Sequence, residues 1–328
     1  MKKSAISALL FALLLIFCSC SAGKDVNPAG AEKEIDFSLA AGGETAFDPT
    51  QIIDFAIDGD NVYLLQGDWS ILKYSADSSF IEKYDYNLGE YGLTASRIAF
   101  GGGKTYLLDG HNNAIITVGS DRAISVSRLD FSDVGLVKSF YPTKSGTLMM
   151  SFADIDGAYT VEVDPRGEEA AIIGEKIAGY LIGENITYLP TVEEDENGKS
   201  VVEVTVYESG AATEKFRIGS DESARSMFGL SVYGKSGDDL FGLLHEFVNT
   251  TGNPEDEKYM QTSVSINTKS GRIKTSESRF SGAEIIELSE RGAYCMKISD
   301  GILKVKPVGK YFSDWSDSTV YTLKKISK

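Results

Sequence analysis

The sequence predicts an all-β fold, a six-bladed β-propeller whose blades are four-stranded antiparallel sheets. Short apolar strands recur about every 8–12 residues between turns rich in Gly, Asn, Asp and Ser. No long segment has the apolar period of a helix. One group of strands repeats along the chain every 40–50 residues or so, a period that is typical of a propeller blade.

The repeat is anchored by an aromatic or large apolar residue that follows the first turn of each unit. The segments "GDNVYLLQ" and "GGKTYLLD" show the pattern most clearly. The six aligned anchors are Tyr63, Tyr106, Met149, Tyr188, Phe241 and Tyr294, spaced by 43, 43, 39, 53 and 53 residues. A β-sandwich or a pair of jelly rolls would also be all-β, but neither requires a common period.

Each unit contains four expected strands, which in the first unit are "IIDFAI", the anchor strand, "SILKYS" and "FIEKYDY". The turns between them carry residues that tolerate the positive φ angles of hairpins. The expected blades cover residues 52–88, 96–132, 136–177, 179–220, 227–280 and 284–325. In the last blade "STVYTLKK", residues 318–325, is the expected fourth strand.

A ring of blades has to be closed, because its first and last sheets would otherwise expose their edges. "EIDFSLA", residues 34–40, alternates like a strand and is a candidate to join the last blade beside residues 318–326. Closure by the C-terminal strand alone is the alternative, and the sequence does not choose between them. Residues 35–328 are expected to form a single propeller domain.

The strand pattern of "NVYLLQ" and "KTYLLD", followed by a turn and an apolar strand, resembles the six-bladed propellers of the NHL-like and TolB-like superfamily. The resemblance covers residues 52–325 and concerns the rhythm of the repeat. The Trp-Asp dipeptide of WD40 blades is not repeated in the chain. That superfamily includes enzymes, ligand sensors and protein-binding scaffolds, so the resemblance implies a shape and not an activity.

Residues 1–19 are expected to be a lipoprotein signal peptide. Two lysines precede an apolar run, Leu9 to Phe17, that is shorter than the roughly 20 residues of a membrane-spanning helix. Cys20 after this run resembles the lipobox cysteine of bacterial lipoproteins, which implies a lipid on Cys20 and an extracytoplasmic protein anchored to a bacterial membrane. An uncleaved membrane anchor is the alternative. Residues 20–34 are small and polar, as in a flexible tether.

The charge excludes one class of partner. The chain has 32 basic and 48 acidic residues, a net charge of −16, and removal of Lys2 and Lys3 with the signal peptide leaves −18. Such a surface repels nucleic acid, so no nucleic-acid partner is expected.

Cleavage of the signal peptide would remove Cys18, and acylation would occupy Cys20. Only Cys295 then remains as a free cysteine, and its apolar neighbours indicate a buried structural thiol rather than a reactive one.

The repeat also predicts where a ligand would bind. In a propeller the loops between the second and third strands share one face with the loops between blades, and members of the resembling superfamily usually bind ligands there. The long segment at residues 245–261 is expected to be a loop inserted on this face. The candidate ligand- or partner-binding residues on the face are Trp69, Asp109, His111, His245 and Tyr259. Trp69 is either a recognition anchor or a residue packed on its own turn.

Acidic turns raise the question of metal binding. Asp154 and Asp156 in "DIDG" are the candidate metal ligands, with calcium as the candidate ion. Asp also favours turns because it caps its own backbone, and that interpretation is the stronger one. "EEDENG" is not an EF-hand loop: with Gly198 in sixth position, Val204 occupies the twelfth position, where a Glu is required. No other cofactor is expected.

Two functions from different classes follow. The first is a membrane-anchored binding module that presents its loops to a cell-envelope protein, peptide or glycan. The second is a calcium-assisted hydrolase or lyase that uses loop carboxylates. The sequence contains no G-x-S-x-G, H-E-x-x-H or P-loop motif, and no catalytic residue is assigned. The absence of such motifs favours the binding module.

Overall fold

The structure, a computed structural model, describes residues 35–40, 47–130, 137–154, 157–183, 185–280 and 284–326. They belong to one compact unit, Ile35–Lys328. The expected signal peptide, Cys20 and the tether lie outside the described residues. No helix in the described part of the chain is long and apolar enough to cross a membrane.

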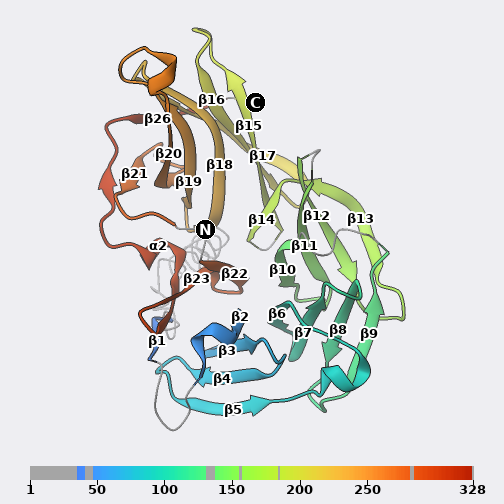
Figure 1. Cartoon of the computed structure of the whole chain (residues 1–328). Helices are drawn as coiled ribbons and strands as arrows, with labels where there is room; N and C mark the ends of the chain where they lie inside the picture. The colour runs from blue at the N-terminus through green and yellow to red at the C-terminus, as the bar shows by residue number, and fades with distance from the viewer. Residues whose placement is uncertain are drawn as a thin grey trace, which may run out of the picture. The chain divides into compact units, whose positions relative to one another are not determined.

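The described strands of this unit form six antiparallel sheets arranged around a common axis (Figure 1). This confirms the six-bladed propeller. The first blade consists of β2 (Ile52–Asp58), β3 (Asn61–Gln66), β4 (Ile71–Ser75) and β5 (Phe80–Tyr84). The second consists of β6 (Arg97–Gly101), β7 (Lys104–Asp109), β8 (Ala114–Val118) and β9 (Ile124–Arg128). The third consists of β10 (Val137–Pro142), β11 (Leu148–Asp154), β12 (Gly157–Asp164) and β13 (Ala171–Ala178).

The remaining blades follow in chain order. The fourth contains β14 (Tyr180–Gly183), β15 (Ile186–Glu194), β16 (Ser200–Glu208) and β17 (Ala211–Ser220). The fifth contains β18 (Arg225–Ser236), β19 (Asp239–Val248), β20 (Lys258–Asn267) and β21 (Ile273–Ser276). The sixth contains β22 (Ile285–Ser289), β23 (Gly292–Ser299) and β24 (Ile302–Pro307). Short 3-10 helices are η2 (Pro49–Gln51), η3 (Leu88–Tyr91) and η5 (Pro254–Asp256).

The residues that defined the repeat are core residues. All six anchors lie in the second strand of their blade, and none is more than 7% exposed. A side chain in this strand is covered by the neighbouring sheet, which is why the position repeats as an aromatic or large apolar residue. Cys295 in β23 is also fully buried, which confirms that its thiol lies in the core.

The ring is closed by the N-terminal strand β1 (Phe37–Ala40). It pairs antiparallel with β24, with Phe37 opposite Val305, and becomes the outermost strand of the sixth blade. The ring of Phe37 is fully buried and meets Tyr74 of the first blade edge-on, with ring centroids 5.7 Å apart. Of the two alternatives, closure by the N-terminal segment is therefore confirmed, but its expected position beside residues 318–326 is wrong, because its neighbour is β24.

The prediction that residues 318–325 form the fourth strand of the sixth blade is wrong. After β24 the chain passes through α2 (Val308–Tyr311) and adds β25 (Ser316–Asp317) to β21. It ends in β26 (Tyr321–Lys325), which pairs with β17 as a fifth strand of the fourth blade. The reason is that β1 already covers the edge of β24, whereas the edges of β17 and β21 are open to pairing.

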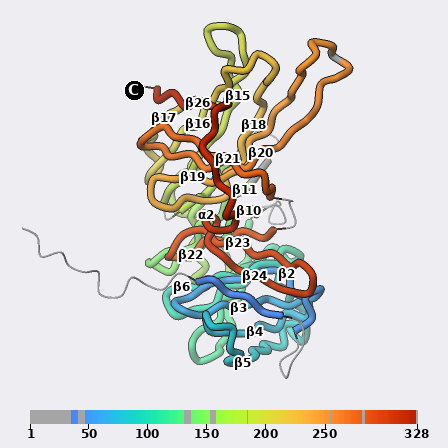
Figure 2. Tube along the Cα trace, turned by 90° about the vertical axis from the view of Figure 1, so that its left-hand side faces the viewer, coloured from blue at the N-terminus to red at the C-terminus, as the bar shows by residue number. Residues whose placement is uncertain are grey.

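The insert at residues 245–261, expected to be a loop, is strand at both ends, in residues 245–248 and 258–261. β19 continues to Val248 and β20 begins at Lys258, with Phe247 opposite Tyr259. Only residues 249–257 connect the two strands. Aromatic and β-branched residues sustain the ladder here, so the insertion lengthens the hairpin. This hairpin and the β15–β16 hairpin project from the same side of the domain in both views (Figures 1 and 2).

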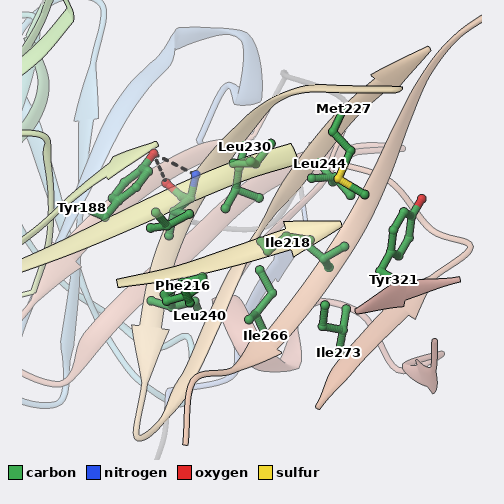
Figure 3. Packing of buried hydrophobic residues seen from close by; sticks show 14 of the residues in the cluster. Tyr188, Phe216, Ile218, Met227, Leu230, Leu240, Leu244, Ile266, Ile273 and Tyr321 are labelled. Atoms are coloured by element: carbon green, nitrogen blue, oxygen red, sulfur yellow. Dashed lines mark hydrogen bonds between the residues drawn. The ribbon is translucent and has the colours of Figure 1, made fainter. Parts of the chain in front are cut away.

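A hydrophobic cluster fills the space between the fourth and fifth blades (Figure 3). Phe216 from β17 and Leu240 from β19 are among its buried members. The Tyr188 hydroxyl accepts a hydrogen bond from the Val232 N–H at 2.8 Å and donates one to its carbonyl oxygen at 3.2 Å. Packing and hydrogen bonding therefore fix the position of β18 relative to the fourth blade.

Candidate binding site

A cavity of about 680 Å³ lies where the inner strands of the second to sixth blades begin. Its lining includes one residue near the start of each of these strands: Arg97, Lys138, Tyr180, Phe228 and Ile285. The connections between blades enter the inner strands at this end. The cavity therefore opens on the face that the inter-blade loops share with the loops between second and third strands.

Two β-bulges in β18 supply side chains to this cavity. The pairing of β18 with β19 shifts by one residue at Phe228 and again at Tyr233, so neither residue has a partner opposite it. Both line the cavity. A bulge changes the direction of a side chain that a regular ladder would place elsewhere, and it recurs next to binding sites for this reason.

Four aromatic side chains of the fifth blade form a patch beside the cavity, which we call the aromatic rim: Phe228, His245, Phe247 and Tyr259. The ring centroid of Phe228 lies 4.6 Å from that of Phe247 and 5.5 Å from that of Tyr259. Phe228 and Phe247 are each 38% exposed and Tyr259 is 51% exposed. Contiguous exposed aromatic surface is a feature of interaction sites.

His245 connects the aromatic rim to the cavity wall. Its Nε2 lies 2.9 Å from the Ser231 hydroxyl and its Nδ1 lies 2.8 Å from the Tyr259 hydroxyl. Partial burial lowers the pKa of His245. The imidazole is therefore neutral at neutral pH, with one ring nitrogen donating a hydrogen bond and the other accepting one.

Arg97 connects the cavity to a buried group of charges near the axis. Its guanidinium lies 2.5 Å from the Glu287 carboxyl, 3.7 Å from that of Asp54, and donates to the Lys138 carbonyl oxygen at 3.0 Å. Burial raises the pKa of Asp54 to about 6 and that of Glu287 well above its ordinary value, although Arg97 opposes both effects. The two carboxyls therefore retain a proton at a pH at which exposed carboxyls have lost theirs.

The candidates from the first and second blades do not line this cavity. Trp69 is half-buried and packs on Gly89, which makes it part of the core between these blades. Asp109 is fully buried and accepts hydrogen bonds from the N–H groups of Thr94, His111 and Asn112. Asp109 therefore organises its own loop. His111 is exposed in that loop.

His245 and Tyr259 are the sequence candidates that the structure brings together at the cavity, whereas Asp109 and His111 meet within their own loop. Asp154 is the last residue of β11, with its backbone opposite Gly157, while Asp156 lies outside the described residues. In the part of the chain that the structure describes, no group of three or more His, Cys, Asp and Glu side chains could hold a metal ion.

Sequence analysis missed Phe228, Tyr233 and Arg97. The aligned anchors say nothing about the inner strand, and a bulge has no sequence motif of its own. One signal for the fifth blade was the 53-residue spacing on either side of Phe241, which indicated that this unit was enlarged. Arg97 could have been noticed as a charged residue at the start of an otherwise apolar inner strand.

No protein-family model matches the chain, and no curated protein matches it. Among solved structures, streptogramin B lyase is 8% identical with a TM-score of 0.40, over 91% of this chain and 100% of that one. Virginiamycin B lyase from Staphylococcus aureus is 10% identical with a TM-score of 0.39, over 89% and 99% of the two chains. BamB from Moraxella catarrhalis is 11% identical with a TM-score of 0.38, over 84% and 89%. Similarity at this level carries no argument about function, which has to come from the site itself.

Proposed function

We propose that this protein is a binding module of the bacterial cell envelope that holds part of a protein, peptide or glycan in the cavity beside the aromatic rim. In this proposal a lipid on Cys20 anchors the propeller on the extracytoplasmic side of a membrane. One observation carries the proposal: a cavity of about 680 Å³ opens beside Phe228, Phe247 and Tyr259, which remain partly exposed to solvent.

The chemistry of the cavity supports binding. Its volume falls in the range of small-ligand pockets. Apolar and aromatic side chains alternate in its walls with polar groups such as Thr191 and Ser231, and three charged residues, Arg97, Lys138 and Glu284, also line it. Aromatic side chains contribute large contact areas at a small cost in conformational entropy, which is why they dominate binding energy at interfaces. The bulges at Phe228 and Tyr233 then serve to direct such side chains toward a ligand.

The test is site-specific photo-cross-linking in intact cells, with Cys20 retained. A photo-reactive residue at Tyr259 should give a discrete adduct that mass spectrometry identifies. A photo-reactive residue at Ile172, on the outer edge of the third blade and 48% exposed, is the matched control and should give none. Absence of any adduct at Tyr259, together with no ligand retained on the purified protein, would contradict the proposal.

The arrangement of Ser231, His245 and Tyr259 supports a second candidate, an acyl hydrolase. If the Tyr259 hydroxyl accepts from Nδ1–H, then Nε2 is free to accept the Ser231 proton at 2.9 Å. Attack of the Ser231 oxygen on an ester carbonyl would transfer its proton through His245 to the leaving alcohol, and water would release the acid. The test is labelling by a fluorophosphonate probe, which this candidate predicts for the unaltered protein and not for Ser231→Ala.

The calcium-assisted hydrolase or lyase receives no support from the described residues, since they contain no cluster of ligands.

A further inference from the structure

We infer that the occupant of the cavity is a basic peptide segment of a partner protein, which inserts an apolar side chain between two acidic hairpins. This inference rests on the proposed function and names its ligand class. It follows from the combination of the aromatic rim with the charges at the tips of the β15–β16 and β19–β20 hairpins.

Both hairpin tips are acidic. The first carries Glu193, Glu194, Asp195 and Glu196, and the second carries Glu255, Asp256 and Glu257. All except Asp195 are exposed. Among the described residues no ion pair involves the side chains of Glu193, Glu194, Glu196, Glu255 or Glu257. The nearby lysines, Lys199 and Lys258, are fewer than the carboxylates, so both tips carry net negative charge.

The strands that lead into the two tips line the cavity. Thr191 and Val192, which line it, lie in the last part of β15, just before the first acidic tip. His245, which also lines it, lies in the last part of β19, and Tyr259 follows the second acidic tip. The hairpins project from the same side of the domain in Figures 1 and 2. A ligand that enters the cavity from this side therefore passes between two negative surfaces.

Charge complementarity favours a basic peptide over a neutral glycan. The lining contains two cations, Arg97 and Lys138, but Arg97 is paired with Glu287 and the carboxylates of the two tips outnumber Lys138. The net negative charge beside the opening therefore attracts cations and increases their rate of association. Lys and Arg also interact favourably with the faces of exposed aromatic rings such as Phe228 and Tyr259. The cavity accommodates a few side chains and not a folded domain. In a short segment with an apolar residue between basic ones, the basic residues would face the acidic tips and the apolar residue would enter the cavity.

The experiment measures fluorescence anisotropy of labelled peptides with the full-length protein in detergent. The probe is Lys-Lys-Trp-Lys-Lys, compared with Glu-Glu-Trp-Glu-Glu and Lys-Lys-Ala-Lys-Lys. We expect only the first to bind well, with an affinity that falls about tenfold or more between about 50 mM and about 500 mM salt. Replacement of Glu193, Glu194 and Glu196 by Gln should weaken binding about tenfold.

Two further variants separate the contributions of charge and of the cavity. Phe228→Ala should weaken the Trp peptide about tenfold and leave the Ala peptide unchanged. Glu168→Gln with Glu169→Gln, on the exposed β12–β13 turn, removes charge elsewhere and should leave binding unchanged. Equal affinity for the basic and acidic Trp peptides would overturn the inference. If Tyr259 still forms a cross-link in cells, that result would leave the proposed function intact and point to a neutral peptide or a glycan.

Discussion

The first two blades and the fourth and fifth blades are built on the same repeat but differ in the length of their strands. β2 to β9 contain five to seven residues each, whereas β15 to β20 contain nine to twelve. Only the longer blades receive a fifth strand from the C-terminal segment. The short blades complete the ring, and the long ones extend beyond it and provide most of the cavity wall.

The same residue types have different roles in the two regions. In the second blade Asp109 is buried and its carboxylate is occupied by N–H groups of its own loop. At the hairpin tips of the fourth and fifth blades, Glu194 and Glu257 are exposed. Acidic loop residues therefore stabilise turns in one region and create an electrostatic field in the other, although they look alike in the sequence.

The largest difference in stability between the long and the short blades is expected from a substitution of Glu246, a fully buried residue of β19. It accepts hydrogen bonds from Arg225 at 2.8 Å and from the Tyr321 hydroxyl at 2.5 Å, and so connects the fifth blade to β26. Glu246→Ala leaves the Arg225 guanidinium with an incomplete set of partners. We expect the free energy of unfolding, measured by denaturant titration, to fall by about 3 kcal/mol.

The matched control for Glu246 is a carboxylate–arginine pair of the short blades. Glu82 pairs with Arg122 at 2.7 Å, but their side chains are 41% and 65% exposed. Glu82→Ala should cost about 0–1 kcal/mol, because solvent screens an exposed pair. If the free energy of unfolding fell by a similar amount in the two variants, β26 would add little to the stability of the long blades.

The next prediction compares two repeat-equivalent tyrosines. Tyr188→Phe removes both hydrogen bonds to Val232 and should lower the free energy of unfolding by about 1–2 kcal/mol, because the Val232 groups are buried. Tyr106→Phe removes only a contact of 3.5 Å with the Gly146 carbonyl oxygen and should cost about 0.5 kcal/mol or less. Denaturant titration of both variants measures the two changes in the free energy of unfolding. Equal changes would contradict the proposal that the hydrogen bonds of Tyr188 to Val232 stabilise the contact between the fourth and fifth blades.

A smaller effect is expected at the axis, where Glu287 meets Arg97 and Asp54. The raised pKa means that folded Glu287 keeps its proton above pH 4.5, where the unfolded chain has released it. The unfolded state then binds fewer protons, so stability falls as pH rises from about 4.5 to the folded pKa. Glu287→Gln should remove this loss, so the stability of the variant should fall less between pH 4 and pH 8 than that of the unaltered chain.

Asp54 remains in this variant and acts in the same direction, since its pKa of about 6 also exceeds its ordinary value. The pH dependence should therefore decrease without disappearing. Thermal melts at pH 4 and pH 8 measure it. A variant that is equally destabilised at both pH values would show that the Glu287 carboxyl is needed for packing and not as a titrating group.

The smallest expected effect concerns calcium. The described residues of both regions lack a cluster of metal ligands, so the melting temperature should not change when calcium or EDTA is added. A clear rise in melting temperature with calcium would point to ligands among residues such as Asp156, which lies outside the described residues, and would revive the metal-assisted function.

The sequence alone determined the class of fold, the number of blades and their core positions. The physical reason is that a buried strand has to be apolar at each repeat, so Tyr63, Tyr106 and Tyr294 mark equivalent positions without any knowledge of the tertiary structure. It also limited closure to two alternatives, because a sheet edge has to be covered by one end of the chain or the other.

Only the tertiary structure decided which edges the C-terminal segment covers and which side chains form the site. Pairing of β26 with β17 joins residues about 100 positions apart, and local pattern does not specify such a partner. The bulges that expose Phe228 and direct Tyr233 depend on how β18 registers with β19. The cavity exists because five inner strands begin at one place, which is a property of the closed ring and of no single segment.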